Sequence, residues 1–171
     1  MKEGTQPERH AIVLAAGKGT RFNSERAKVL HRLCGKPMVC HVLDRLMELE
    51  VSRILVVVGY NSPSVQEALE GYPVEFVHQE QQLGTGHAVL TAMPHLADAG
   101  GSTLVLYGDS PLITTKTLGK LLHTREREEA DDGFPVLSVL FPSSLSSSLG
   151  NSMEMMLSSS DFISSGPMGE S

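Results

Sequence analysis

The chain has 171 residues, of which 40% are hydrophobic and 20% are charged, as is typical of one globular domain. The formal net charge is −6 and the basic residues are scattered, which argues against a nucleic-acid-binding face. No apolar run is long enough to span a membrane, and residues 1–10 are too polar for a signal peptide, so we expect a cytoplasmic protein. Cys34 and Cys40 fit no metal-binding spacing, and both are predicted to be buried thiols.

Strand and helix patterns alternate between residues 11 and 141. Apolar runs predict strands at 11–16, 53–58, 74–78, 103–107 and 135–141. Helical spacing of apolar residues and proline or serine at the first turn predict helices at 37–50, 62–70, 85–92 and 114–129. The alternation predicts an α/β fold, a doubly wound and mostly parallel Rossmann-like sheet. Ligands of such sheets bind beyond the carboxyl ends of the strands, which points to segments 17–28 and 108–111.

The first of these segments is rich in glycine and carries positive charge. With the residues before it, it reads Leu14-Ala15-Ala16-Gly17-Lys18-Gly19-Thr20-Arg21. Glycines two residues apart let backbone N–H groups approach an anion, so this stretch predicts a phosphate-binding loop. It lacks the Gly-Lys-Ser/Thr ending of the P-loop, and Phe22 stands where the dinucleotide fingerprint has its third glycine.

Further motifs narrow the kind of phosphate that this loop binds. They are Lys28-Val29-Leu30, Gly35-Lys36-Pro37-Met38, the stretch Gln79 to Ala88 with its Gly84-Thr85-Gly86-His87, and Tyr107-Gly108-Asp109. In this order after the glycine-rich loop, they resemble the signature of the sugar-phosphate nucleotidyltransferases. They are most similar to the uridylyltransferase domain of the bifunctional bacterial enzymes that make UDP-N-acetylglucosamine, a cell-wall precursor. The resemblance implies a sheet of the nucleotide-diphospho-sugar transferase type, incomplete at the C-terminus.

The resemblance implies uridylyl transfer, in which N-acetylglucosamine-1-phosphate attacks the α-phosphorus of UTP and pyrophosphate leaves. Arg21 and Lys28 are then the predicted catalytic residues, because they neutralise the phosphates, and Asp109 is the predicted Mg²⁺ ligand. The predicted substrate-binding residues are Leu14, Ala15, Ala16, Gly17, Lys18, Gly19, Thr20, Gln79, Gly84, Thr85, Tyr107 and Gly108.

Several of these residues have an ordinary structural alternative. Lys18 and Lys36 are equally well explained as surface charges. Asp109 also suits a turn after a strand, and Gln79 suits pairing with the backbone at a strand end. Four histidines are predicted to be structural: His31, His41, His87 and His95.

The resemblance stops near residue 141. The family's Gly-Tyr-Gly-Arg segment, acceptor-sugar residues, second metal ligand and acetyltransferase repeats have no counterpart, and eleven serines lie between Ser143 and Ser165. We expect a flexible N-terminus at 1–10, a partial nucleotidyltransferase domain at 11–141 and a disordered tail at 142–171. Two alternatives stay open: a truncated UTP-binding fragment with weak or no catalysis, and transfer to another sugar phosphate. The sequence does not predict the oligomeric state.

Overall fold

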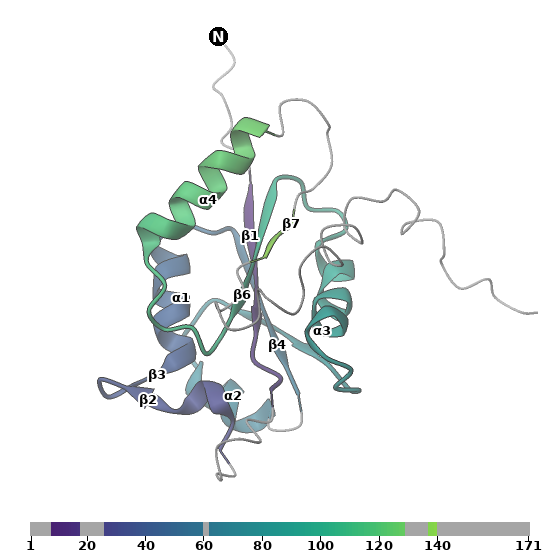
Figure 1. Ribbon diagram of the computed structural model, residues 1–171. Helices are drawn as coiled ribbons and strands as arrows, with labels where there is room; N and C mark the ends of the chain where they lie inside the picture. Colours follow the sequence, from purple (N-terminus) through teal and green to yellow (C-terminus); the bar gives the residue numbers. More distant parts are fainter. Residues whose placement is uncertain (1–7, 18–25, 60–61, 129–136, 140–171) are drawn as a thin grey trace, which may run out of the picture. The chain divides into compact units, whose positions relative to one another are not determined.

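The structure is a computed structural model that describes residues 8–17, 26–59, 62–128 and 137–139 (Figure 1). The chain divides into two units, Met1–Leu140 and Phe141–Ser171, and every described residue lies in the first. The expected tail at 142–171 and most of the expected N-terminus at 1–10 lie outside the described residues. Within the described ranges, no helix is long and apolar enough to cross a membrane.

Five parallel strands form the central sheet. They are β1 (Arg9–Leu14), β4 (Arg53–Val58), β5 (Glu75–His78), β6 (Ser102–Tyr107) and β7 (Leu137–Val139). Their order is β5-β4-β1-β6-β7, and every neighbouring pair is parallel. The chain therefore builds one side of β1 first, with β4 and β5, and then crosses to the other side with β6. This arrangement confirms the predicted α/β fold with a doubly wound parallel sheet.

Helices cover both faces of this sheet, as Figure 1 shows for α1 and α4 on one side and α3 on the other. The helices are α1 (Met38–Glu48), α2 (Ser62–Ala68), α3 (Thr85–Ala92) and α4 (Thr115–Glu128), and a 3₁₀ turn, η2 (Met93–Leu96), continues α3. Alternate strand residues enter two separate cores. Ala11 and Val13 of β1 belong to the core beneath α1, whereas Ile12 and Leu14 belong to the core beneath α3. Strands buried on both faces explain the continuous apolar runs in the sequence.

Most boundaries lie within two residues of those predicted, and 53–58 and 85–92 agree in full. Strand β1 begins at Arg9 because His10 is buried and its Nε2 lies 3.0 Å from the Gly100 carbonyl oxygen. The same strand ends at Leu14 rather than at residue 16. Polar residues at the start of β1 thus belong to a buried strand, which the apolar pattern alone does not indicate.

A short hairpin between β1 and α1 was not predicted. After a 3₁₀ turn, η1 (Lys28–Leu30), strand β2 (Arg32–Leu33) pairs antiparallel with β3 (Lys36–Pro37). Cys34 and Gly35 connect them with φ values of 49° and 81°, the left-handed geometry of a two-residue hairpin turn. The prediction of a buried Cys34 is wrong, because this turn exposes it, whereas the predicted burial of Cys40 in α1 is confirmed.

Candidate functional site

The carboxyl ends of β1 and β6 lie side by side at one edge of the sheet, because the two strands are parallel neighbours. Beyond them, the backbone N–H of Gly108 donates to the Leu14 carbonyl oxygen at 3.0 Å. A Cβ at position 108 would lie 3.1 Å from that oxygen and 3.1 Å from Val29 Cγ1. Glycine therefore allows η1 to pack closely over the end of β6.

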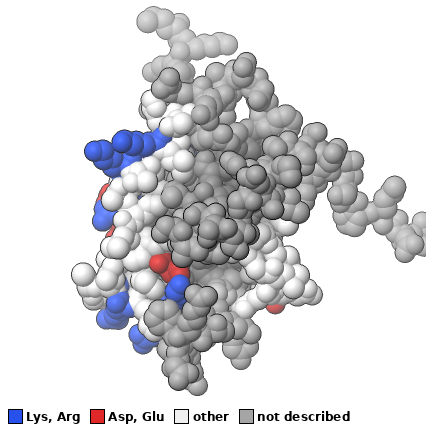
Figure 2. Space-filling model, viewed as in Figure 1, with Lys and Arg blue, Asp and Glu red and all other residues white. Residues whose placement is uncertain are grey.

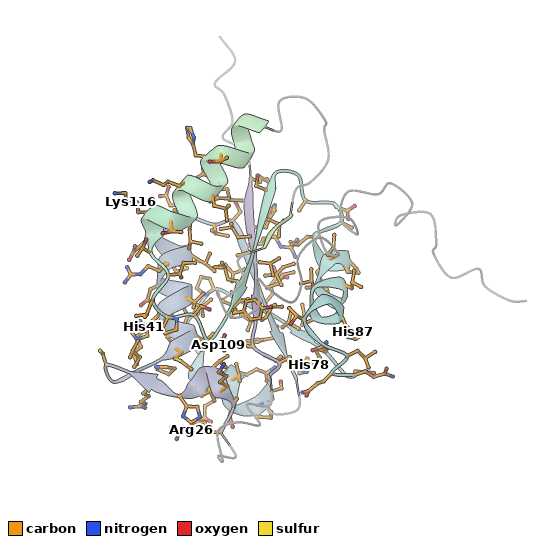
Figure 3. The ribbon with its side chains drawn as sticks, in the orientation of Figure 1. Arg26, His41, His78, His87, Asp109 and Lys116 are labelled. Carbon is orange, nitrogen blue, oxygen red and sulfur yellow. The ribbon has the colours of Figure 1, made fainter. Side chains whose placement is uncertain are left out.

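Lys28 and Asp109 form an ion pair at this edge, between Nζ of the lysine and Oδ2 of the aspartate. Lys28 begins η1, and Asp109 follows β6 by two residues. The lysine side chain is 39% exposed and the aspartate side chain 19% exposed. Figure 3 labels Asp109 below the end of β6, and Figure 2, in the same view, shows acidic and basic atoms in contact there. The structure thus brings a predicted catalytic residue and the predicted metal ligand together.

Gln79 holds a second segment of the site in place. Its backbone N–H donates to the Val58 carbonyl oxygen at 2.9 Å, directly after β5. Its side chain is buried, and the amide Nε2 lies 3.2 Å from the Gly84 carbonyl oxygen and 2.9 Å from Nδ1 of His87. These two contacts account for both amide hydrogens, so the Gln79 amide joins the two ends of the 79–87 segment. His87, labelled at the start of α3 in Figure 3, has the structural contact expected of it.

Gln82 links this segment to the end of β1. Its Nε2 donates to the Ala16 carbonyl oxygen at 3.1 Å. Gly59, which follows β4, leaves room for the contact: a Cβ there would lie 2.5 Å from Gln82 Nε2 and 2.9 Å from the Ala16 oxygen. Neither Gln82 nor Gly59 is among the residues predicted from the sequence. The one available signal is that Gln82 stands inside the motif that contains Gln79 and Gly84.

The other predicted site residues divide into two groups. Those that the structure describes cluster at the carboxyl edge or beside it: Leu14, Ala15, Ala16 and Gly17 after or at the end of β1, Gly84 and Thr85 at the start of α3, and Tyr107 and Gly108 at the end of β6. Four residues of the glycine-rich loop lie outside the described residues: Lys18, Gly19, Thr20 and Arg21. The described residues therefore lie together at or beside one edge of the sheet, and their individual roles stay predictions.

Lys36 lies in a different cluster, directly after the turn of the β2–β3 hairpin. Its Nζ pairs with Asp44 of α1, and the Tyr72 hydroxyl donates to the other carboxylate oxygen at 2.9 Å. The hydrogen bond to Asp44 raises the pKa of Lys36. Burial raises the pKa of Asp44, but hydrogen bonds from Lys36 and Tyr72 outweigh it, so the net pKa lies below its usual value. His41 contacts the Leu33 carbonyl oxygen at 2.9 Å, in keeping with the expected structural role.

One carboxylate stands where a metal ion is expected. Asp109 is half-buried at the strand end, and among the described residues no group of three or more His, Cys, Asp or Glu side chains is placed to hold a metal. A single carboxylate fits Mg²⁺, because this ion takes one or two protein carboxylates and completes its shell with phosphate oxygens and water. The donor set is therefore suited to a metal that arrives with a nucleotide.

The parallel sheet and the polar groups at its carboxyl edge define an α/β domain of the kind whose ligands bind at that edge. Residues 11–157 match the model of the MobA-like NTP transferase domain. The chain therefore belongs to this family of nucleotidyltransferases.

Individual relatives agree with this family assignment. The bifunctional protein GlmU of Listeria welshimeri is 52% identical over 125 residues, which are 72% of this chain and 27% of that protein. The chain thus spans about a quarter of the length of the curated relatives it matches.

Two solved structures share the fold. A nucleotidyl transferase from Methanothermobacter thermautotroptrophicus has a TM-score of 0.58 at 25% identity, and the match covers 68% of this chain and 57% of that chain. A protein from Mycobacterium tuberculosis H37Rv, solved as a manganese complex, has a TM-score of 0.59 at 18% identity over 70% of this chain and 60% of its own. At that identity, the second likeness concerns the fold alone.

Proposed function

We propose that this chain transfers the uridylyl group of UTP to N-acetylglucosamine-1-phosphate and releases pyrophosphate. The observation that carries the proposal is the Lys28–Asp109 ion pair at the carboxyl edge of the sheet. The 52% identity to a GlmU protein and the resemblance of the motifs to uridylyltransferase domains give further support. Both substrates are metabolites of the cytoplasm, and we propose that compartment for the protein.

The segments and side chains at the carboxyl edge suit different parts of the two substrates. In this proposal the backbone of Leu14 to Gly17 and the segment from Gln79 to Thr85 enclose the nucleoside. The hydrogen bond from Gln82 to Ala16 holds these two segments against each other. The triphosphate then extends toward Lys28, with Lys18 and Arg21 as the predicted partners of its outer phosphates. Tyr107 and Gly108 line the acceptor-sugar side.

The reaction asks little covalent chemistry of the protein. The acceptor phosphate oxygen forms a bond to the α-phosphorus. The bond from that phosphorus to the oxygen that bridges the α- and β-phosphates of UTP breaks, and this oxygen leaves as a terminal oxygen of pyrophosphate. Catalysis of such a step is positioning and stabilisation of negative charge. Lys28 supplies the stabilising positive charge at the edge, because its ammonium can exchange the Asp109 carboxylate for a phosphate oxygen of the nucleotide.

Asp109 would hold the Mg²⁺ ion that accompanies UTP. When bound, the ion neutralises phosphate charge, which favours departure of pyrophosphate. Lys28 would leave the carboxylate for the nucleotide, so the same exchange frees Asp109 for the metal.

The test is pyrophosphate release by the purified chain with UTP, N-acetylglucosamine-1-phosphate and Mg²⁺. We expect release to depend on all three, with CTP, ATP and GTP as poorer donors. Glucose-1-phosphate in place of the amino sugar tests transfer to another sugar phosphate. Lys28→Ala is the control, and release no greater than that of this variant contradicts the proposal.

A second candidate function is UTP binding with weak or no transfer. The observation that favours it is that Asp109 belongs to no group of three or more metal-ligating side chains among the described residues. One carboxylate suffices for a Mg²⁺ ion that arrives with UTP, but it holds the ion less firmly during transfer than two would. Calorimetric titration with UTP separates the two. Binding without turnover supports the second candidate, and the absence of binding contradicts both.

A further inference from the structure

The contact between Gln82 and Ala16 determines how the backbone leaves β1. The Leu14 carbonyl oxygen accepts from Gly108 beyond β6, and the Ala15 N–H donates to Val57 of β4 at 2.8 Å. The backbone of β1 thus forms hydrogen bonds alternately with the β6 side and the β4 side up to Ala15. Continued alternation would turn the Ala16 carbonyl toward β6. Instead, this carbonyl lies beside Gly59 and Gln82, on the side of β4.

The direction of the Ala16 carbonyl fixes the direction of the next N–H group. The described residues contain no cis peptide bond, and in a trans peptide the C=O and the N–H point in opposite directions. The N–H of Gly17 therefore points away from β4. Since β1 lies between β4 and β6, this is the side on which Asp109 and its partner Lys28 lie.

We propose that Gln82 is a positioning residue that holds this peptide so that the Gly17 N–H faces the bound triphosphate. A peptide turned the other way would present a carbonyl oxygen to the phosphates, and two groups of negative character would then face each other. The inference rests on the proposed function, because it requires a nucleotide at this edge. Gly59 is part of the same device, since any larger residue would displace the Gln82 amide.

The first experiment compares Gln82→Glu with Gln81→Glu by calorimetric titration of UTP in the presence of Mg²⁺. Glutamate at position 82 keeps the shape of the side chain but removes the amide donor to Ala16. Gln81 is an exposed neighbour, so its variant adds the same charge at nearly the same place. We expect the UTP dissociation constant of Gln82→Glu to exceed that of Gln81→Glu by about 3- to 10-fold, the loss typical of one hydrogen bond.

A second measurement needs no nucleotide. In the unliganded protein, Gln82→Glu should move the amide chemical shift of Gly17, and Gln81→Glu should leave it in place. Gly59→Ala should also weaken UTP binding, because its Cβ would displace both the Gln82 amide and the Ala16 carbonyl.

The outcomes separate this inference from the function on which it rests. If the natural chain does not bind UTP, the proposed function fails and the inference fails with it. If the natural chain binds UTP and the two glutamate variants bind it equally, the role of Gln82 is wrong and the proposed function stands. Weaker binding by Gln82→Glu together with an unmoved Gly17 amide also contradicts the role.

Discussion

Two lysine–aspartate pairs in this protein look alike in the sequence and differ in their surroundings. Lys28 and Asp109 meet at the carboxyl edge of the sheet, whereas Lys36 and Asp44 meet beside the turn of the β2–β3 hairpin. The two lysine side chains are almost equally exposed, at 39% and 38%. Residue type and the exposure of the lysine therefore do not separate the candidate site from a structural ion pair, whereas position relative to the strand ends does.

A third residue, Tyr72, makes the Lys36–Asp44 pair a structural clamp, that is, a cluster that ties several segments together. Tyr72 donates its hydroxyl to Asp44, and its ring centroid lies 5.9 Å from Lys36 Nζ. The cluster thereby joins β3, α1 and the segment after α2. The Lys28–Asp109 pair instead joins two segments that flank the proposed substrate, and it can exchange partners when a phosphate arrives.

The largest expected effect comes from replacing each lysine by methionine. Lys28→Met should lower pyrophosphate release by about 10²- to 10³-fold, because it removes a positive charge at the reacting phosphate. Lys36→Met should leave release close to that of the natural chain and lower the melting temperature instead. Steady-state assays and thermal unfolding of both variants measure the contrast. Equal losses of activity in the two variants would contradict it.

The two aspartates should differ in their response to metal. Asp109→Asn should lower activity by about 10²-fold and shift the Mg²⁺ dependence to higher concentration, because an amide is a poorer ligand for this ion than a carboxylate. Asp44→Asn should leave the Mg²⁺ midpoint in place. Activity measured over a Mg²⁺ titration decides, and an unchanged midpoint in Asp109→Asn would exclude this residue as the ligand.

Gly108, next to the Lys28–Asp109 ion pair, should tolerate substitution less well than a glycine in a helix. Gly108→Ala places a Cβ 3.1 Å from the Leu14 oxygen and from Val29, so we expect a loss of about 1–3 kcal/mol in unfolding free energy and roughly tenfold lower activity. Gly119→Ala in α4 is the matched control, because its Cβ would meet only Leu49 at 3.7 Å. Alanine there should raise stability by up to about 1 kcal/mol, since it favours the helix. Urea unfolding and assays of both variants test the prediction.

The smallest effect concerns the pH dependence of the clamp. The pKa of Asp44 is lowered in the folded chain, so its contribution is present above the unfolded value of about 3.9 and is lost as the pH falls through the lower folded value. Asp44→Asn should be less stable than the natural chain by under about 1 kcal/mol at pH 6, because both partners are partly exposed. That difference should shrink below about pH 4.

Urea unfolding over a pH series measures the difference in stability, and Asp98→Asn, at an exposed position, is the control. A difference that persists at the lowest pH would show that the ion pair is not its source.

Local patterns predicted the elements that bury apolar residues on both faces. Strand β4 agrees with the prediction in full because every residue from Ile54 to Val58 is buried. The β2–β3 hairpin escaped prediction because each strand has two residues, too few for an alternating pattern, and its turn is Cys-Gly rather than a common turn pair. Strand β1 was predicted to begin late, since burial of His10 depends on the Gly100 carbonyl far along the chain.

The site was also predictable only in part, because several of its contacts join residues far apart in the chain. The alternation of strands and helices predicted ligand-binding segments after the first and fourth strands, and Lys28 and Asp109, one from each segment, do lie together. The partner of Lys36 could not be predicted, because Asp44 and Tyr72 reach it only after α1 and α2 have packed. The contact between Gln82 and Ala16 spans 66 residues and depends on the missing side chain of Gly59, which no local pattern encodes.

The two-residue turn of the hairpin gives the protein a selective chemical handle. The chain has two cysteines; Cys34 at the turn is exposed, whereas Cys40 is buried and burial raises the pKa of its thiol. A maleimide or nitroxide reagent should therefore react at Cys34 alone under native conditions, without any engineered residue. Because the hairpin follows η1 directly, such a label lies in the segment that carries Lys28. Its fluorescence or spin-label mobility can test whether a nucleotide draws that lysine from Asp109.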